Sequence, residues 1–477
     1  MRKETLELAL QGGTEAWSFQ QRAARLNQAE VLPVLAEVFS ALCPPEAVVR
    51  IDRMVIDLGR ISLRNFEKEL PGTLRQRAFE ALKSQVKRAV SAQQNGPELR
   101  DFVPREGERS RLLSNEQSGI ELLRFFMETG VLPWWAGDQG MEEVLDHLVE
   151  AVPDELKDLV AENLESEPFR KRLVYQFPHA LLIKVLRLLR PGEGARIETW
   201  FQDLERLGEG SSLGLFRTGK WRRIAWDHVF MNLAGKEGSG EPPAFLLLRR
   251  LAREENMDLE SFLERIREGM NVATSPDEPA GPSVQHRAPA QRESSPGKPA
   301  LREEAGAQDS EQLQVRVENA GLVLLWPFLG EFFENLGYLN ENGFVDQDTN
   351  LRAVHVLEFA GTGKEHRPEP FLSLNKVLCG LDITVPILRE TDLTETEKEK
   401  SEELLAAVVS RWSALKSTSV QGFRSAFLNR QGLLTGKGKA WILHVERESY
   451  DLLLERLPWG ISMIRLSWME ATIRVEW

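Results

Sequence analysis

The feature that most constrains the fold is an apolar run, Ala320–Gly330, which reads AGLVLLWPFLG. Its only polar side-chain atom is the indole nitrogen of Trp326. A helix that spans a membrane needs about 20 apolar residues, whereas this run stops at Glu331. The segment therefore predicts a buried or partner-facing helix that does not cross a membrane, with a kink or a restart at Pro327.

The same run contains no candidate nucleophile, metal ligand or phosphate-binding loop. A chain whose strongest signal is apolar packing is more typical of an assembly component than of an enzyme. The aromatic composition is unusual, because the chain contains 12 Trp and 22 Phe but only 3 Tyr. Trp contributes mainly to cores and interfaces, and filling large cores is the simplest use of so many bulky side chains.

Charge and cysteine content narrow the class further. The formal net charge of −13 argues against a general nucleic-acid binder, which needs clustered Lys and Arg. Only Cys43 and Cys379 occur, far apart, which excludes a disulfide scaffold or a four-cysteine zinc site and suits a reducing compartment. The start, MRKETLELALQGG, lacks the apolar core of a secretory signal. We expect a cytoplasmic protein, unless a larger particle incorporates and exports it.

Composition along the 477 residues predicts a mainly α, multi-domain protein. The clearest boundary is 269–312, which is rich in Pro, Ser and Gly and has almost no large apolar residue, so it predicts a disordered linker of roughly 120 to 140 Å when extended. A weaker break runs from Gln93 to Asn115. The expected parts are an N-terminal α+β unit over 1–95, a helical region over 116–268, the linker, and a C-terminal α+β domain over 313–477.

In the N-terminal unit, helical spacing covers Thr14–Leu42 and Asn65–Ala92, and alternation over Val48–Leu58 predicts a short strand that ends at Gly59. The middle region reads as a solenoid-like helical array without a clean repeat. Its expected helices are Ile120–Thr129, Met141–Val149, Glu155–Leu164, Phe169–Gln176, Ala180–Leu189, Arg196–Leu207, Trp221–Leu233 and Ala244–Ile266.

The C-terminal domain mixes helices with a small antiparallel sheet. Thr394 and Glu397 form the signature of a capping box at one helix start. The expected strands are Ala440–Val445, Ile461–Leu466 and Ile473–Trp477. The expected helices are Ala320–Leu336, Ala353–Ala360, Leu372–Leu381, Thr396–Leu415, Gln421–Leu428 and Ser449–Leu457.

Patterns for catalysis are missing from the sequence. The seven His form no HExxH and no helical pair at i, i+4, so no metal site and no cofactor is expected. His355, on an apolar helix near Glu358, reads as a capped or core histidine, and Cys379 as a small buried apolar residue. GTGK at Gly361–Lys364 lacks the upstream glycine and the strand of a phosphate loop. We therefore predict that the protein is not an enzyme.

Several segments together resemble one family. They are ENAGLVLLWPFLGEFFENLGYL, RAVHVLEFAGTG, LSLNKVLCGL, RWSALKSTSVQGFRSAFLNRQGLL and YDLLLERLPWGISMIRLSWM in the C-terminal part, with IDRMVIDLGRI at Ile51–Ile61 and ELLRFFMETGVLPWWAG at Glu121–Gly137. Their order and sequence resemble the contractile injection system tape measure proteins, components of phage-tail-like particles that fire a rigid tube through a contracting sheath. The resemblance spans most of the chain except the linker.

The resemblance implies a length ruler whose partners are the tube, baseplate or cap subunits. A fully helical chain of this size would reach about 700 Å, but 24 Pro and 35 Gly and the absence of sustained heptads favour folded domains. Two mechanisms remain open: partial unfolding to thread the tube, or an assembly factor at the baseplate or cap. The main alternative is a chaperone or adaptor for baseplate, tube or cargo subunits that is absent from the mature particle.

Six large apolar side chains near turns or kinks are the candidate partner contacts, with core packing as their alternative role. They are Trp134, Trp135, Trp326, Phe328, Trp459 and Trp468.

Overall fold

The computed structural model describes most of the chain as two compact units, 1–160 and 161–477. The described residues are 23, 26, 30–42, 47–51, 54–62, 65–94, 110–133, 135–136, 140–209, 211–235, 243–273, 313–415 and 418–477. Most of the predicted linker, residues 274–312, lies outside them, and so does Cys43. The division of the chain into four parts stays a prediction. None of the helices in the described residues combines the length and the apolar character that a membrane span requires.

The first unit is built on α3 (Phe66–Gln94), which confirms the helix expected over Asn65–Ala92. Its buried residues recur every four positions and pack on α2 (Leu32–Leu42), the described end of the helix expected from Thr14. The strand predicted over Val48–Leu58 is shorter in the structure. β1 covers Ala47–Ile51, and residues 54–58 are not in a strand. β1 pairs antiparallel with β2 (Ser110–Ser114), which lies in the stretch read as a break.

Ser114 ends β2 and caps the next helix, α4 (Asn115–Thr129), through a capping box with Gln117. Gly130 ends α4 in the left-handed conformation, φ 75°, which an L side chain rarely adopts. Two more helices follow, α5 (Met141–Ala151) and α6 (Pro153–Asn163), where the sequence predicted them.

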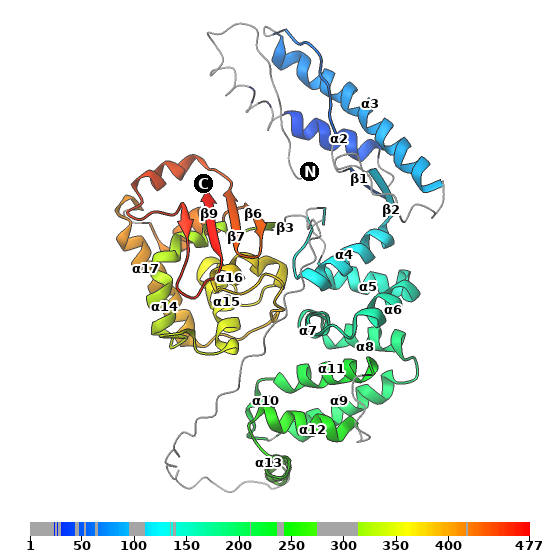
Figure 1. Cartoon of the computed structure of the whole chain (residues 1–477), viewed down its shortest axis with the longest axis vertical. Helices are drawn as coiled ribbons and strands as arrows, with labels where there is room; N and C mark the ends of the chain where they lie inside the picture. Colours follow the sequence, from blue (N-terminus) through cyan, green and yellow to red (C-terminus); the bar gives the residue numbers. More distant parts are fainter. Residues whose placement is uncertain are drawn as a thin grey trace. The chain divides into compact units, whose positions relative to one another are not determined.

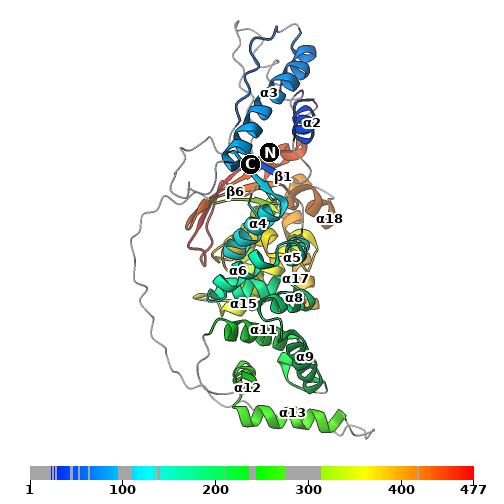
Figure 2. The same cartoon turned by 90° about the vertical axis from the view of Figure 1, so that its right-hand side faces the viewer.

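The second unit begins with a helical array of its own, and Figure 2 shows α11, α12 and α13 in successive layers. The amphipathic spacing predicted these helices within a few residues, with two exceptions. The short helix Gly214–Arg217 was not predicted. The single helix expected over Ala244–Ile266 is two helices, because the chain turns at Asn256, φ 54°. The helices are α7 (Glu167–Gln176), α8 (His179–Leu189), α9 (Gly194–Gly208), α10 (Gly214–Arg217), α11 (Lys220–Leu233), α12 (Pro243–Glu254) and α13 (Leu259–Ala273).

The C-terminal part is α+β, as expected (Figure 1). The predicted helix over Ala320–Leu336 is a 3-10 helix, η2 (Ala320–Phe328), followed by α14 (Leu329–Asn335), so the chain restarts beside Pro327. The other helical segments are α15 (Gln347–Thr362), η3 (Glu369–Leu372), α16 (Ser373–Leu378), α17 (Glu395–Arg411), η4 (Ser413–Leu415), α18 (Val420–Phe423), η5 (Arg424–Leu428) and η6 (Ser449–Arg456).

The main sheet differs from the predicted three-stranded antiparallel sheet in its number of strands and in the direction of one pair. It has five strands in the order β3-β6-β7-β9-β8, and β7 and β9 run parallel. Figure 1 shows β6, β7 and β9 side by side. The strands are β3 (Leu313–Val317), β6 (Gly432–Lys437), β7 (Ala440–Val445), β8 (Met463–Ile464) and β9 (Thr472–Glu476), and a separate hairpin joins β4 (Leu339–Asn340) to β5 (Gly343–Phe344).

Individual residues in this part behave as expected. Cys379 is fully buried, and burial raises the pKa of its thiol. His355 is a core residue, and burial lowers its pKa to about 4. The GTGK stretch ends a helix, with Gly363 at its C-cap, φ 75°, whereas a phosphate loop would precede one. The capping box of Thr394 and Glu397 opens α17.

Candidate partner-binding surface

The apolar run forms the base of the candidate surface. Every residue from Ala320 to Leu325 is buried in η2. The backbone of η5 passes so close that a Cβ on Gly321 would stand 1.7 Å from the carbonyl oxygen of Phe427. The Ala320 N–H donates to the carbonyl of Arg430 at 2.9 Å. Because only glycine fits at this crossing, the run is fixed in place from its first turn.

A buried polar network holds the chain just before η2. Asn319 donates to the Glu358 carboxylate at 2.7 Å and to the Asn375 side-chain oxygen at 2.8 Å. Arg367 donates to the other Glu358 oxygen at 2.9 Å and also pairs with Glu318. Asn319, Glu358 and Asn375 are each 0% exposed, so this network would be costly to break. Sequence reasoning missed it, and the only local signal is an Asn directly before an apolar run.

At its far end, η2 brings large side chains to the surface. Trp326 and Phe328 are half-buried, and Pro327 between them is exposed. The segment after η6 meets them: the Trp326 indole N–H donates to the carbonyl of Gly460 at 2.9 Å, and the rings of Phe328 and Trp459 are 5.1 Å apart at 77°. We call Trp326, Pro327, Phe328, Pro458, Trp459 and Gly460 the aromatic surface.

Trp459 is supported from beneath by the fully buried Trp412, with ring centroids 6.5 Å apart. The indole N–H groups of both residues are buried, and neither finds a hydrogen-bond acceptor within the part of the chain that the structure describes. Ring packing therefore holds Trp459, whereas Trp326 is also anchored by a hydrogen bond. Three of the six predicted contact residues, Trp326, Phe328 and Trp459, thus share one surface.

The other three predicted residues lie elsewhere. Trp468 donates to the carbonyl of Leu378 at 2.9 Å and packs its ring on Phe333 and Phe344, which fastens the C-terminal segment to α14 and β5. Trp468 thus packs within the C-terminal part, and its role as a partner contact stays a prediction. Trp134 is outside the described residues.

Trp135 belongs to the first unit, where the Arg50 guanidinium lies 3.3 Å from the centroid of its ring. Arg50 also donates to Ser118 at 2.8 Å and pairs with Glu121, both on α4. Cation–π stacking and two polar contacts therefore join β1, α4 and Trp135.

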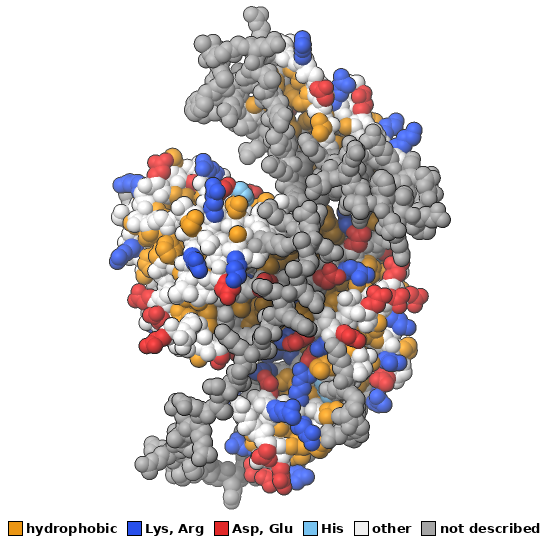
Figure 3. Space-filling model, in the orientation of Figure 1, with side chains coloured by type: hydrophobic (Ala, Val, Ile, Leu, Met, Phe, Trp, Pro, Cys, Tyr) orange, Lys and Arg blue, Asp and Glu red, His pale blue; other side chains and the backbone are white. Residues whose placement is uncertain are grey.

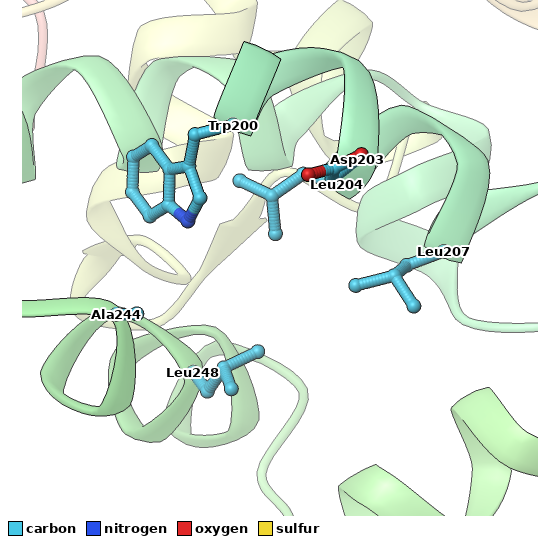
Figure 4. Close-up of a pocket in the computed structure, with 6 residues that line it drawn as sticks. All are labelled: Trp200, Asp203, Leu204, Leu207, Ala244 and Leu248. Atoms are coloured by element: carbon cyan, nitrogen blue, oxygen red, sulfur yellow. The ribbon is translucent and has the colours of Figure 1, made fainter. Parts of the chain in front are cut away.

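A small apolar pocket lies between α9 and α12 in the second unit (Figure 4). Its volume is about 80 Å³, and its only ionisable lining residue is Asp203. The remaining lining residues are Trp200, Leu204, Leu207, Ala244 and Leu248. The pocket could hold one aliphatic side chain, and it does not gather the convergent polar groups of a catalytic site.

The described residues show neither a metal site nor, on the face seen in Figure 3, a surface patch of one charge sign. Among the described residues, no group of three or more His, Cys, Asp or Glu could hold a metal ion. On the face seen in Figure 3, acidic and basic side chains are interspersed over the described parts. The aromatic surface is therefore the feature that best fits recognition of a partner, since such interfaces are rich in aromatic side chains and poor in charge.

Comparison with known proteins gives one match. The family model described as contractile injection system tape measure protein matches residues 1–477. No curated protein and no solved structure matched the chain.

Proposed function

Because the chain belongs to the family of contractile injection system tape measure proteins, we propose that it is a non-enzymatic assembly protein of a contractile, phage-tail-like particle and helps to set tube length. The family match over the whole chain carries this proposal. The family is a structural one, and its name, tape measure protein, supports an association with the tube. We propose tube, baseplate or cap subunits as the partners, and the cytoplasm and the assembled particle as the locations.

The aromatic surface supports binding to such subunits. Trp and Phe side chains that are half-buried before binding lose little conformational freedom when a partner covers them, and Trp is frequent at binding hot spots. Trp326 and Trp459 are both held in place, by the hydrogen bond to Gly460 and by the ring of Trp412 respectively. This arrangement favours a preformed docking point over a loop that must order on contact.

The lengths of the helices bear on how the tube length would be set. The longest described helix, α3, has 29 residues and so spans about 44 Å, and α17 has 17 residues and spans about 26 Å. A rod of about 700 Å would need the whole chain in one helix. We therefore propose that the protein acts through folded domains, and that any ruler function requires these domains to separate or extend.

A chaperone or adaptor that leaves before maturation is the alternative, because a preformed docking point would serve it equally well. Quantitative mass spectrometry of purified particles separates the two roles. A ruler remains at a fixed low copy number per tube, whereas a chaperone is absent from mature particles and present in assembly intermediates. A copy number that rises in proportion to the tube subunit would contradict both roles and indicate a polymerising structural subunit.

A further inference from the structure

A cluster of buried charges joins two parts of the second unit that lie far apart in the sequence. Arg172 on α7 donates from Nε to both carboxylate oxygens of Glu369, at 3.1 and 3.2 Å. Lys376 on α16 donates to one of these oxygens at 2.7 Å and to the carbonyl of Ile383 at 2.9 Å. Arg172, Glu369 and Lys376 are each 0% exposed. Arg172 also donates to the carbonyl of Thr384.

Further hydrogen bonds surround the cluster. Gln176 donates to the carbonyl of Ile387 at 2.6 Å, and its side-chain oxygen accepts from the Glu369 N–H at 3.1 Å. The Arg389 N–H donates to the carbonyl of Tyr175 at 3.3 Å. The end of α7 therefore lies against residues 369–389, although residues 177–368 separate them along the chain.

We propose that these contacts form an intramolecular latch, which holds the helices α7–α13 to the C-terminal domain and can open while both remain folded. The latch residues are Arg172, Gln176, Glu369, Lys376 and Arg389. No sequence pattern predicted the latch, because its two sides are about two hundred residues apart, 197 between Arg172 and Glu369.

The chemistry of the contacts is the reason why the latch can open. Burying an ion pair costs desolvation energy that offsets much of its attraction, so a docked charge cluster gains little over a hydrated one. When α7 leaves, water can hydrate Arg172 and the carbonyls of Thr384 and Ile387. The two-point contact of Arg172 with Glu369 nevertheless makes the docked geometry specific.

The distribution of charge makes Arg172 the residue to substitute in a test of the latch. Glu369 and Lys376 both belong to the C-terminal domain and form a neutral pair on their own. Burial lowers the pKa of Lys376, while the neighbouring Glu369 counteracts this. Removing Arg172 therefore leaves a balanced pair in the domain, whereas removing Glu369 would leave two cations side by side.

Opening of the latch would also increase the distance over which the two folded parts can separate. The use of this distance along a tube rests on the proposed function. With the latch open, the covalent connection between Ala273 and Leu313 is segment 274–312, and 40 residue steps reach at most about 140 Å. The two folded parts could then separate along a tube. The latch itself can be tested on the isolated protein, so its failure would leave the proposed function standing.

Hydrogen–deuterium exchange of the full-length protein is the test, because the Glu369 and Arg389 amides donate across the latch and report its opening. In Arg172→Gln we expect peptides that contain these amides to exchange at least tenfold faster, while peptides from α15 and α17 keep their wild-type protection. The matched control is Lys171→Gln, which removes an exposed ion pair with Glu167 on the same helix and should change none of these rates.

Unchanged exchange at Glu369 and Arg389 in Arg172→Gln would overturn the proposal, and so would a loss of protection in α15 and α17. A second measurement, on the wild-type protein, tests the latch even if the variant misfolds. As urea is raised below the global transition, the Glu369 and Arg389 amides should exchange at a lower concentration than the amides of α15 and α17. Exchange of all of them at the same concentration would show that the latch does not open separately.

Discussion

Gly321 shows how strongly a single residue can determine the position of the apolar run. In Gly321→Ala, the new Cβ would overlap the carbonyl oxygen of Phe427, so the backbone of η2 or η5 must move. We expect the free energy of unfolding of the second unit to fall by about 3 kcal/mol, measured by urea denaturation with Trp fluorescence.

Gly330 provides the matched control for this change, because an added Cβ meets no heavy atom within 4 Å there. Gly330→Ala in α14 should stabilise or leave the protein unchanged, within about 1 kcal/mol. Equal destabilisation by the two variants would show that the backbone crossing at Gly321 is unimportant.

Glu397 gives the second unit a defined response to acid. Burial alone would raise the pKa of this carboxyl, but hydrogen bonds from Arg352 and Tyr338 outweigh it and hold the pKa at about 2, below the ordinary 4.5. Since the folded-state pKa is lowered, the stabilisation is present above pH 4.5 and is lost as the pH falls towards 2. We predict that wild-type stability declines over this window by about 2 kcal/mol more than that of Glu397→Gln.

Urea denaturation at several pH values between 5 and about 2.5 measures this difference, and the two proteins are compared by the slope of stability against pH. Parallel slopes would mean that Glu397 titrates normally in the folded protein and that its contacts with Arg352 and Tyr338 do not favour its charged form.

At the residue scale, the sequence predicted what depends on local pattern. His355 and Cys379 were read as buried because they lie among apolar neighbours, and both are buried. The network of Asn319, Glu358 and Asn375 could not be predicted, because its members are 39 and 56 residues from Asn319 and nothing local identifies them as partners.

At the level of the helices, α17 allows a test of the capping box of Thr394 and Glu397, which the sequence predicted. The Thr394 hydroxyl accepts from the Glu397 N–H at 3.3 Å, and the Glu397 carboxylate accepts from the Thr394 N–H at 2.6 Å. Thr394→Ala removes the first of these bonds, together with the bond that the Thr394 hydroxyl donates to the Glu397 carboxylate at 2.9 Å, and should cost about 1 kcal/mol in urea denaturation. Thr396→Ala, an exposed position in the same turn, should change stability by less than about 0.5 kcal/mol. A loss of similar size in both would indicate that helix propensity, and not the cap, is responsible.

Elements with a clear period were predicted well, and those that depend on distant partners were not. The amphipathic spacing placed α4 to α9 because each helix buries one face. β3 and β6 were missed, since β6 contains two glycines and β3 becomes a strand only by pairing with it. The parallel alignment of β7 with β9 likewise depends on the path of the chain between them. The break between α12 and α13 was missed because Asn256 adopts φ 54° without a glycine or proline to signal it.

On the scale of the whole molecule, the aromatic surface should be needed for assembly and dispensable for folding. Pro327 is exposed, so Pro327→Lys places a charge in the surface without removing a ring contact. Because interface centres exclude charge, we expect particle yield to fall at least tenfold in cells that carry only this variant. Val345→Lys is the control, since Val345 is 51% exposed outside the aromatic surface. Normal yield from Pro327→Lys would exclude this surface as a docking point.

The mainly α architecture, the α+β C-terminal part and the short β element near the N-terminus followed from composition and pattern, and the family from the order of its motifs. Partner contacts were harder to assign, because a large aromatic side chain near a turn has the same sequence signature whether it docks or packs. Trp326 and Trp468 illustrate this: one reaches the aromatic surface, and the other fastens the C-terminal segment to α14.

The proposal that this chain helps to set tube length is tested most directly in a strain that lacks it. The measurement is the length distribution of the particles, determined by electron microscopy. If this chain sets tube length, we expect few particles or tubes of widely scattered length, with uniform length restored when the wild-type chain is supplied. Particles of normal number, uniform wild-type length and full injection activity in the deletion strain would contradict it.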